Sequence, residues 1–174
     1  MKCPYCGYEN IEGADTCEEC QQSLVELSKP RAVSSVDRTL HRERLSRLEN
    51  TNPITVTPDK TVGECLKLLV EKSIGVVLVV EGDQLVGIFS ERDALMRLNS
   101  ESAEHFDKPV ADFMTPNPET LTPESKLAFA LHKMDVGGYR HIPTVDEEGH
   151  VHGIVSVRDV LGRITEDLVG AQDS

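Results

Sequence analysis

The sequence has no tryptophan, and phenylalanine and tyrosine together make up only 4% of its 174 residues. Because hydrophobic residues still account for 39%, a core must be built mainly from valine, leucine and isoleucine. No apolar run is long enough to span a bilayer, and the N-terminus, Met-Lys-Cys-Pro, is unlike a signal peptide. We therefore expect a cytoplasmic protein with no membrane-spanning segment.

Basic residues are scarce: 18 lysines and arginines face 30 aspartates and glutamates, for a net charge of −12. Only residues 28–51 carry a net positive charge, whereas residues 1–27 and the rest of the chain are acidic. Such a balance repels phosphate backbones, so general nucleic-acid binding is not expected. The sequence also lacks a P-loop, a Ser-His-Asp order with a supporting motif and a recognisable pair of catalytic carboxylates. We therefore expect that the protein is not an enzyme.

Four of the five cysteines are concentrated near the N-terminus, as the two pairs Cys3, Cys6 and Cys17, Cys20. Two such CxxC pairs let four thiolates converge on one tetrahedral Zn²⁺. Gly7 follows the first pair, where the turn needs a residue that tolerates positive φ. A segment this short cannot bury enough apolar surface to fold alone, so a metal would stabilise it.

Two alternatives to zinc are a pair of disulfides and a thioredoxin-like redox site. A cytosolic location disfavours stable disulfides, and no βαβ pattern surrounds either pair. Glu18 and Glu19 inside the second pair would raise the thiol pKa, which disfavours redox chemistry. Residues 1–24 resemble the zinc ribbons found at the N-termini of many bacterial and archaeal proteins, which implies contacts with a protein or nucleic acid. The acidic charge favours an unknown protein partner. Cys65 is instead expected in the core.

Residues 28–35 are predicted to be a linker, and Val36, Leu40, Leu45 and Leu48 allow a short amphipathic helix over residues 36–48. Its arginines suggest either a solvated helix that leads into the next domain or a docking site for an acidic partner or a nucleotide phosphate. The apolar face is too thin for membrane binding.

The rest of the chain repeats itself: Gly-Ile-Phe-Ser-Glu-Arg-Asp at residues 87–93 returns as Gly-Ile-Val-Ser-Val-Arg-Asp at residues 153–159. Each copy lies at the start of the last helix in the same order of predicted elements, β-α-β-β-α. In the first half these are an extended segment, a helix from Val62, strands over 75–80 and 85–89, and a helix to about Leu98. In the second half they are residues 118–123, a helix with Leu127, Ala130, Leu131 and Met134 on one face, strands over 141–145 and 151–155, and a helix to about Leu168.

The two repeats resemble CBS (cystathionine β-synthase) domains, and the pair resembles a Bateman module over residues 50–168. The resemblance rests on the Ser-x-x-Asp motif in both halves, on Met114-Thr-Pro116, and on the segment Tyr139 to Pro143. It implies an α/β (α+β) fold in which two repeats form a pseudo-two-fold unit, and it implies a homodimer. The expected domains are a zinc ribbon (1–27), a basic linker and helix (28–49), CBS domain 1 (50–108) and CBS domain 2 (109–170).

The same resemblance implies two clefts for an adenine nucleotide (AMP, ADP or ATP). The aspartate of each motif, Asp93 or Asp159, would bind ribose hydroxyls, with Ser90 or Ser156 near ribose or phosphate. Adenine would lie against backbone and aliphatic groups of Ile54, Thr55, Val56 and Val77 in one half, and of Thr120, Leu121 and Ile142 in the other. The alternative for each Ser-x-x-Asp is purely structural, since a capping box has the same spacing.

Arg140 and His141 make the halves unequal, because their counterparts Gly75 and Val76 offer no cation. A guanidinium is suited to phosphate, and the resemblance pairs both residues with the cleft of Ser90 and Asp93. Arg92 and Arg158 are secondary phosphate ligands in this interpretation. The alternative is an ordinary surface arginine beside a partly buried histidine.

These features favour a non-enzymatic sensor in which a bound adenine nucleotide changes the packing of the repeats, with the ribbon relaying the change to a partner. One alternative is a structural adaptor whose clefts no longer bind ligand. Another is a nucleic-acid-binding protein that uses the ribbon and residues 29–47.

Overall fold

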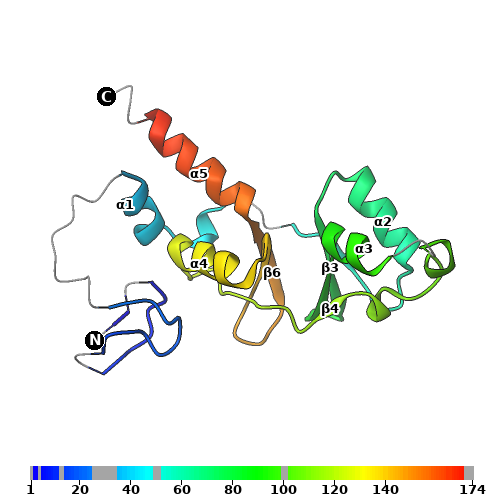
Figure 1. The fold of residues 1–174 in the computed structure, drawn as a ribbon, viewed down its shortest axis with the longest axis horizontal. Helices are drawn as coiled ribbons and strands as arrows, with labels where there is room; N and C mark the ends of the chain where they lie inside the picture. The colour runs from blue at the N-terminus through cyan, green and yellow to red at the C-terminus, as the bar shows by residue number, and fades with distance from the viewer. Residues whose placement is uncertain are drawn as a thin grey trace. The chain divides into compact units, whose positions relative to one another are not determined.

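The computed structural model describes residues 2–3, 5–11, 14–24, 35–48, 52–98 and 102–170. Its chain divides into two compact units that alternate along the sequence. We call Met1–Glu49, Pro123–Arg140 and Val155–Ser174 the helical unit, and Asn50–Thr122 with His141–Ile154 the sheet unit (Figure 1). The expected boundaries at 27/28 and 49/50 lie outside the described residues, and the boundary at 108/109 falls within the sheet unit.

The sheet unit contains a four-stranded sheet in the order β1-β2-β3-β4. β1 (Thr55–Val56) runs parallel to β2 (Val76–Glu81), which pairs antiparallel with β3 (Gln84–Ser90); β3 pairs antiparallel with β4 (Thr115–Pro116). Five of the six β2 residues are buried, as their β-branched content predicts. The turn between β2 and β3 places Gly82 at φ 62°, which glycine adopts without steric cost.

Two helices cover one face of this sheet. α2 (Val62–Glu71) begins at Thr61, whose side chain and that of Glu64 form a capping box. It buries Cys65 and its apolar stripe against Val77, Val79 and Phe89 of the sheet, so the expected core role of Cys65 is confirmed. α3 (Glu91–Arg97) follows β3 directly, and the short helices η3 (Ser102–His105) and η4 (Val110–Asp112) lead to β4.

The second repeat supplies a separate hairpin, β5 (His141–Val145) and β6 (Val151–Ser156). Within the sheet unit, Ile154 and Val151 pack with Val76 and Leu78 of β2 in a second apolar cluster. Leu121 lies parallel beside Thr144 and exchanges backbone hydrogen bonds with its neighbours, in the place that β1 takes in the first repeat. Both repeats therefore have the predicted β-α-β-β-α order.

The helical unit packs α1 (Ser35–Arg42) against α4 (Leu127–Gly137) and α5 (Val157–Gly170). The single helix predicted over residues 36–48 is wrong: α1 ends at Arg42, and a separate 3₁₀ turn, η2 (Leu45–Arg47), follows. The break has a non-local cause. The backbone of residues 43–46 pairs with residues 123–127 ahead of α4, with Leu45 N–H donating to Ser125 C=O and Leu127 N–H to Glu43 C=O. Leu45 and Leu48 are buried, so this segment is part of the fold rather than a solvated linker.

A charged pair joins this segment to the last helix. Arg163 Nε on α5 donates to Glu43 Oε2 at 2.7 Å, and its Nη2 donates to Glu43 Oε1. The side chains are 26% and 19% exposed, so water screens the pair only partly. None of the helices in the described ranges is long and apolar enough to cross a lipid bilayer.

We predict that Arg163→Ala lowers the free energy of unfolding by about 1–3 kcal/mol, because it leaves the Glu43 carboxylate half-buried and unpaired. Urea denaturation followed by circular dichroism measures the change. Lys67→Ala, which removes the exposed pair with Glu71, is the control and should cost less than about 0.5 kcal/mol. Equal effects of the two variants would contradict the structural role of the Arg163 pair.

Candidate functional site

The two cysteine pairs fold as equivalent knuckles. Gly7 N–H donates to Cys3 C=O at 3.0 Å, and Gln21 N–H donates to Cys17 C=O at 2.9 Å. The residue after each pair adopts the left-handed conformation, at φ 82° for Gly7 and 57° for Gln21. Positive φ at Gly7 confirms the expectation from the sequence. Pro4 and Gly13 of these segments lie outside the described residues.

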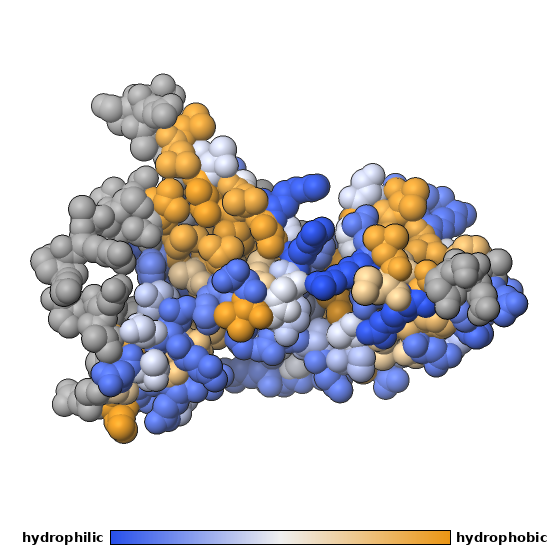
Figure 2. Space-filling model, viewed as in Figure 1, coloured by the Kyte–Doolittle hydropathy of each residue, from blue (hydrophilic) through white to orange (hydrophobic). Residues whose placement is uncertain are grey.

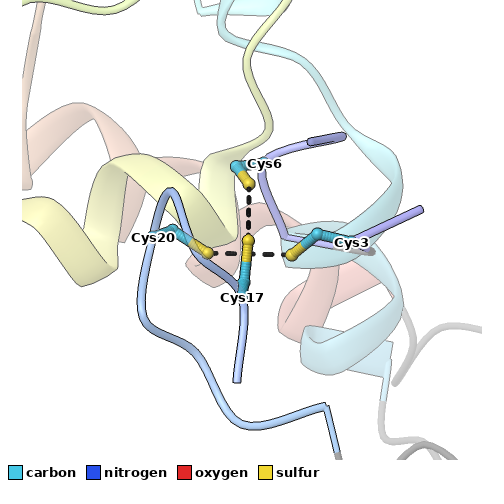
Figure 3. Close-up of side chains that lie close together, drawn as sticks. All are labelled: Cys3, Cys6, Cys17 and Cys20. Atoms are coloured by element: carbon cyan, nitrogen blue, oxygen red, sulfur yellow. Dashed lines mark hydrogen bonds between the residues drawn. The ribbon is translucent and has the colours of Figure 1, made fainter. Parts of the chain in front are cut away.

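The four thiols converge on one point (Figure 3). All four sulfur atoms lie within 4.8 Å of one another, with 3.7 Å between the sulfurs of Cys3 and Cys20 and 3.6 Å between those of Cys6 and Cys17. Sulfurs about 2.3 Å from one tetrahedral ion are about 3.8 Å apart, so this set has the spacing that such an ion requires. Cys3, Cys17 and Cys20 are buried and Cys6 is half-buried.

Asn10 supports the cluster from behind, and the sequence interpretation missed it. Its buried side chain donates from Nδ2 to Cys17 Sγ at 3.4 Å and accepts from Glu18 N–H at 2.9 Å. Burial opposes ionisation of Cys17, but the Cys20 N–H group and the Asn10 amide outweigh it and lower the pKa of the Cys17 thiol to about 6. Burial raises the pKa of Cys6 to about 11. A bound cation would therefore be needed to hold the Cys6 thiol as a thiolate at neutral pH.

Each Ser-x-x-Asp motif forms a capping box at the start of a helix. Asp93 Oδ2 accepts from both the N–H and the Oγ of Ser90, and Ser90 Oγ accepts from Asp93 N–H. Ser156 and Asp159 repeat the three contacts at the start of α5. The structural interpretation of the motif is thus observed in both repeats, and it does not exclude a ligand at the remaining lone pairs.

The two aspartates differ in their second oxygen. Asp93 Oδ1 accepts from Thr115 Oγ1 at 2.9 Å and lies 3.6 Å from the Arg97 guanidinium, which also donates to the Met114 carbonyl. Among the described residues, only Ser156 donates hydrogen bonds to the side chain of Asp159, and both go to Oδ2. A ribose hydroxyl at Asp93 would therefore have to join or replace Thr115, whereas Asp159 keeps an oxygen for a ligand.

His141 lies at the start of α3, beside the first capping box. A Cβ added to Gly75 would stand 2.8 Å from His141 Cε1 and 3.7 Å from Glu91 Oε2, so both side chains reach the space above Gly75. The missing side chain at Gly75 is what makes room for the imidazole. Glu91 N–H donates to Gly75 C=O at 3.1 Å, which holds this strand end against the helix.

The second repeat has the same junction, with Arg140 in place of Gly75: Val157 N–H donates to Arg140 C=O at 3.0 Å. This equivalence agrees with the sequence alignment of the halves. Gly138 at φ 65° ends α4, and Gly137 leaves space for the Tyr139 ring, so the helix stops just before Arg140. The side chains of Arg92, Arg140 and Arg158 are all exposed.

The residues predicted to line the adenine slots fall into two groups. Val56, Val77, Leu121 and Ile142 are buried and belong to the core. Ile54 and Thr120 are half-buried and Thr55 is exposed, so these side chains remain accessible to a ligand. The slot itself remains a prediction.

A polar pocket of about 480 Å³ lies in the sheet unit, next to Thr55. It is lined by Asp83, His150 and His152 among others, at the turn end of β2 rather than the end that carries Ser90. Its volume is within the range of small-molecule sites. It is thus a space beside one predicted adenine contact, separate from the first capping box.

The family is shown by comparison with known proteins. The model of the CBS domain matches residues 45–100 and 110–166, more than half of the chain. This chain belongs to the CBS domain family. It is 31% identical over 118 residues to an uncharacterized 17.7 kDa protein of Acidianus ambivalens, covering 67% of this chain and 70% of that one. It is 36% identical over 110 residues to the CBS domain-containing protein CBSCBSPB5 of Arabidopsis thaliana, covering 63% of this chain and only 20% of that protein.

Among solved structures, CBSX2 in complex with AMP is similar to this CBS protein with a TM-score of 0.63 and 26% identity. The match covers 71% of this chain and 96% of that one. The mixed fold and the tandem CBS pair predicted from the sequence are therefore confirmed.

We predict that Ser90→Ala lowers the free energy of unfolding by about 1 kcal/mol, because Asp93 N–H loses its acceptor and the Asp93 carboxylate loses a donor. Ser90→Thr keeps the hydroxyl and should cost little. Chemical denaturation compares the two variants. An alanine variant as stable as the wild type would show that the box contributes nothing to the fold.

Proposed function

We propose that this CBS protein is a non-enzymatic sensor that binds an adenine nucleotide through its repeats. A zinc-loaded N-terminal ribbon would then pass the signal to a partner protein. The observation that carries the nucleotide site is the convergence of His141, Glu91 and the Ser90–Asp93 box around the side-chain-free position Gly75. The AMP bound in the CBSX2 structure supports an adenylate as the ligand class.

In this proposal, different residues bind the ribose and the phosphate of the nucleotide. Asp93 would hold the ribose hydroxyls, and His141 would donate to the phosphate, with Arg140, the adjacent residue, adding a guanidinium. The Glu91 carboxylate reaches the same space and repels negative charge. Because repulsion grows with each added phosphate, we propose AMP rather than ATP as the preferred nucleotide. The second site, at Ser156 and Asp159, would take the adenosine part of a nucleotide through the unoccupied Asp159 oxygen, with Arg158 near the phosphate of that nucleotide.

The metal would be Zn²⁺ held by Cys3, Cys6, Cys17 and Cys20. Four thiolates in a closed tetrahedral set are typical of a structural zinc site, with no position left for a substrate. When bound, the ion would supply the stability that so short a segment cannot draw from an apolar core.

We also propose that the module is a homodimer. Large apolar side chains are exposed on α5, at Leu161, Leu168 and Val169, and within the sheet unit at Val70, Leu95 and Met96 of α2 and α3 (Figure 2). Within each unit, exposed apolar side chains on neighbouring helices favour protein contacts. A second copy is the occupant that the resemblance to CBS modules implies.

A structural adaptor without a ligand is the second candidate, and one observation favours it. Thr115, Ser90 and Arg97 already engage both oxygens of Asp93. In that case the ribbon would recruit a partner and the clefts would stay empty.

We predict that AMP binds to the full-length protein, and that His141→Ala weakens AMP about tenfold or more while leaving adenosine affinity nearly unchanged. The reason is that, in this proposal, His141 would contact the phosphate and no other part of the nucleotide. Asp93→Asn should weaken both ligands, because it acts on the ribose. Isothermal titration calorimetry with AMP, ATP and adenosine measures the constants, with Asp112→Asn, an exposed aspartate outside the site, as control. Equal losses of affinity for AMP and adenosine in His141→Ala would refute the phosphate role of His141. If no ligand gave any heat, the sensor proposal would fail and the structural adaptor would be the function supported.

We predict that the protein binds one equivalent of zinc, and that Cys17→Ser lowers the affinity more than about 100-fold by removing one thiolate. Cobalt substitution would give the absorption of a tetrahedral thiolate site. Cys65→Ala is the matched control, because this fifth cysteine is buried in the sheet unit and should leave the stoichiometry at one. A wild-type chain that binds no zinc, or a Cys17→Ser variant of wild-type affinity, would contradict the site.

A further inference from the structure

One histidine of the second CBS repeat directly contacts the second cysteine knuckle. His132 lies on α4, half-buried, and its Nε2 is 3.1 Å from the carbonyl oxygen of Cys20. Its Nδ1 is 2.7 Å from Nε2 of Gln22, two residues further along the ribbon. All three residues belong to the helical unit. Neither contact follows from sequence spacing, since about 110 residues separate the partners.

A single tautomer of His132 satisfies both contacts. The Cys20 carbonyl can only accept, so Nε2 must carry the proton and donate. Nδ1 then offers a lone pair, and the Gln22 amide donates to it. A neutral imidazole thus ties two points of the second knuckle to α4, and it does so with complementary bonds.

The Cys20 residue is held on both sides as a result. Its N–H group interacts with the Cys17 sulfur, and its carbonyl accepts from His132. A second contact lies at the first knuckle, where the Tyr5 ring meets His41 of α1 edge-on at 5.2 Å between centroids. Residues of the ribbon therefore contact both α4 and α1.

The helix that carries His132, α4, is part of the second CBS repeat. It buries Leu127, Ala130 and Met134, and it ends at Gly138, just before Arg140. Arg140 follows this helix end two residues later in the sequence.

We propose that His132 is a positioning residue of the metal centre, through which metal loading of the ribbon and the packing of α4 stabilise each other. This inference rests on the proposed zinc site. Outer contacts that orient metal ligands contribute about 10- to 100-fold to metal affinity. Because linkage is reciprocal, zinc must strengthen the contact of His132 with the second knuckle by the same factor by which that contact strengthens zinc binding.

The test measures Zn²⁺ affinity of the full chain by competition with a chelator, and hydrogen exchange of residues 127–137 with and without Zn²⁺. His132→Ala should lower the affinity about tenfold and abolish the zinc-dependent protection of α4. His132→Gln places an amide N–H near the Nε2 position, so it should restore most of the affinity. His132→Asn mimics Nδ1 instead and should not. His152→Ala, an exposed histidine of the sheet unit, is the matched control.

The outcomes separate the two proposals. If the wild-type chain binds no zinc, the zinc site itself fails and the coupling falls with it. If the wild type binds zinc and His132→Ala binds it equally well, or if α4 exchanges at the same rate with and without Zn²⁺, the zinc site stands and the coupling is refuted. A His132→Asn variant that matched His132→Gln would also refute the role assigned to the Cys20 carbonyl.

Discussion

The junction between the last strand and the last helix of each repeat depends on one capping box. A serine at the strand end and an aspartate three residues later exchange three hydrogen bonds, and this starts the helix at a fixed residue. The N–H group of the residue after the serine then donates to the carbonyl of the residue just before the first central strand, Gly75 in one repeat and Arg140 in the other. The same box thus sets the first residue of the helix and the position of the strand end beside it. A ligand at this junction would contact both elements.

Duplication of this junction makes two similar sites, and local substitutions make them unequal. Gly75 leaves space for His141 in the first, and Thr115 occupies the second oxygen of Asp93 there. The corresponding oxygen of Asp159 has no such donor among the described residues. Under the proposed function, the first site would have the better phosphate ligand and the second the more accessible ribose acceptor. An asymmetric pair of this kind would suit the proposed sensor, because its sites would distinguish nucleotides by phosphate number.

The sequence predicted what local patterns determine. Strands, helices, the capping boxes and the knuckle turn at Gly7 all follow from side-chain periodicity or from conformational preference, and the structure confirms them. The break in the helix at Glu43 was missed because partners far along the chain, at residues 123–127, cause it. His132 was missed for the same reason, because 112 residues separate it from Cys20. Asn10 lies only seven residues from Cys17, but no motif marks an asparagine at that position as a support for the cysteine cluster. The slot aliphatics could not be resolved from sequence, since core and ligand contact call for the same residues.

Native mass spectrometry of the purified full-length protein tests the central claim most directly, because it weighs what the chain retains without any added ligand. The account predicts a mass increase of one zinc ion per chain and a further increase that tandem fragmentation identifies as an adenine nucleotide. A chain that carries neither, and that stays at its bare mass after incubation with Zn²⁺ and AMP, would contradict it.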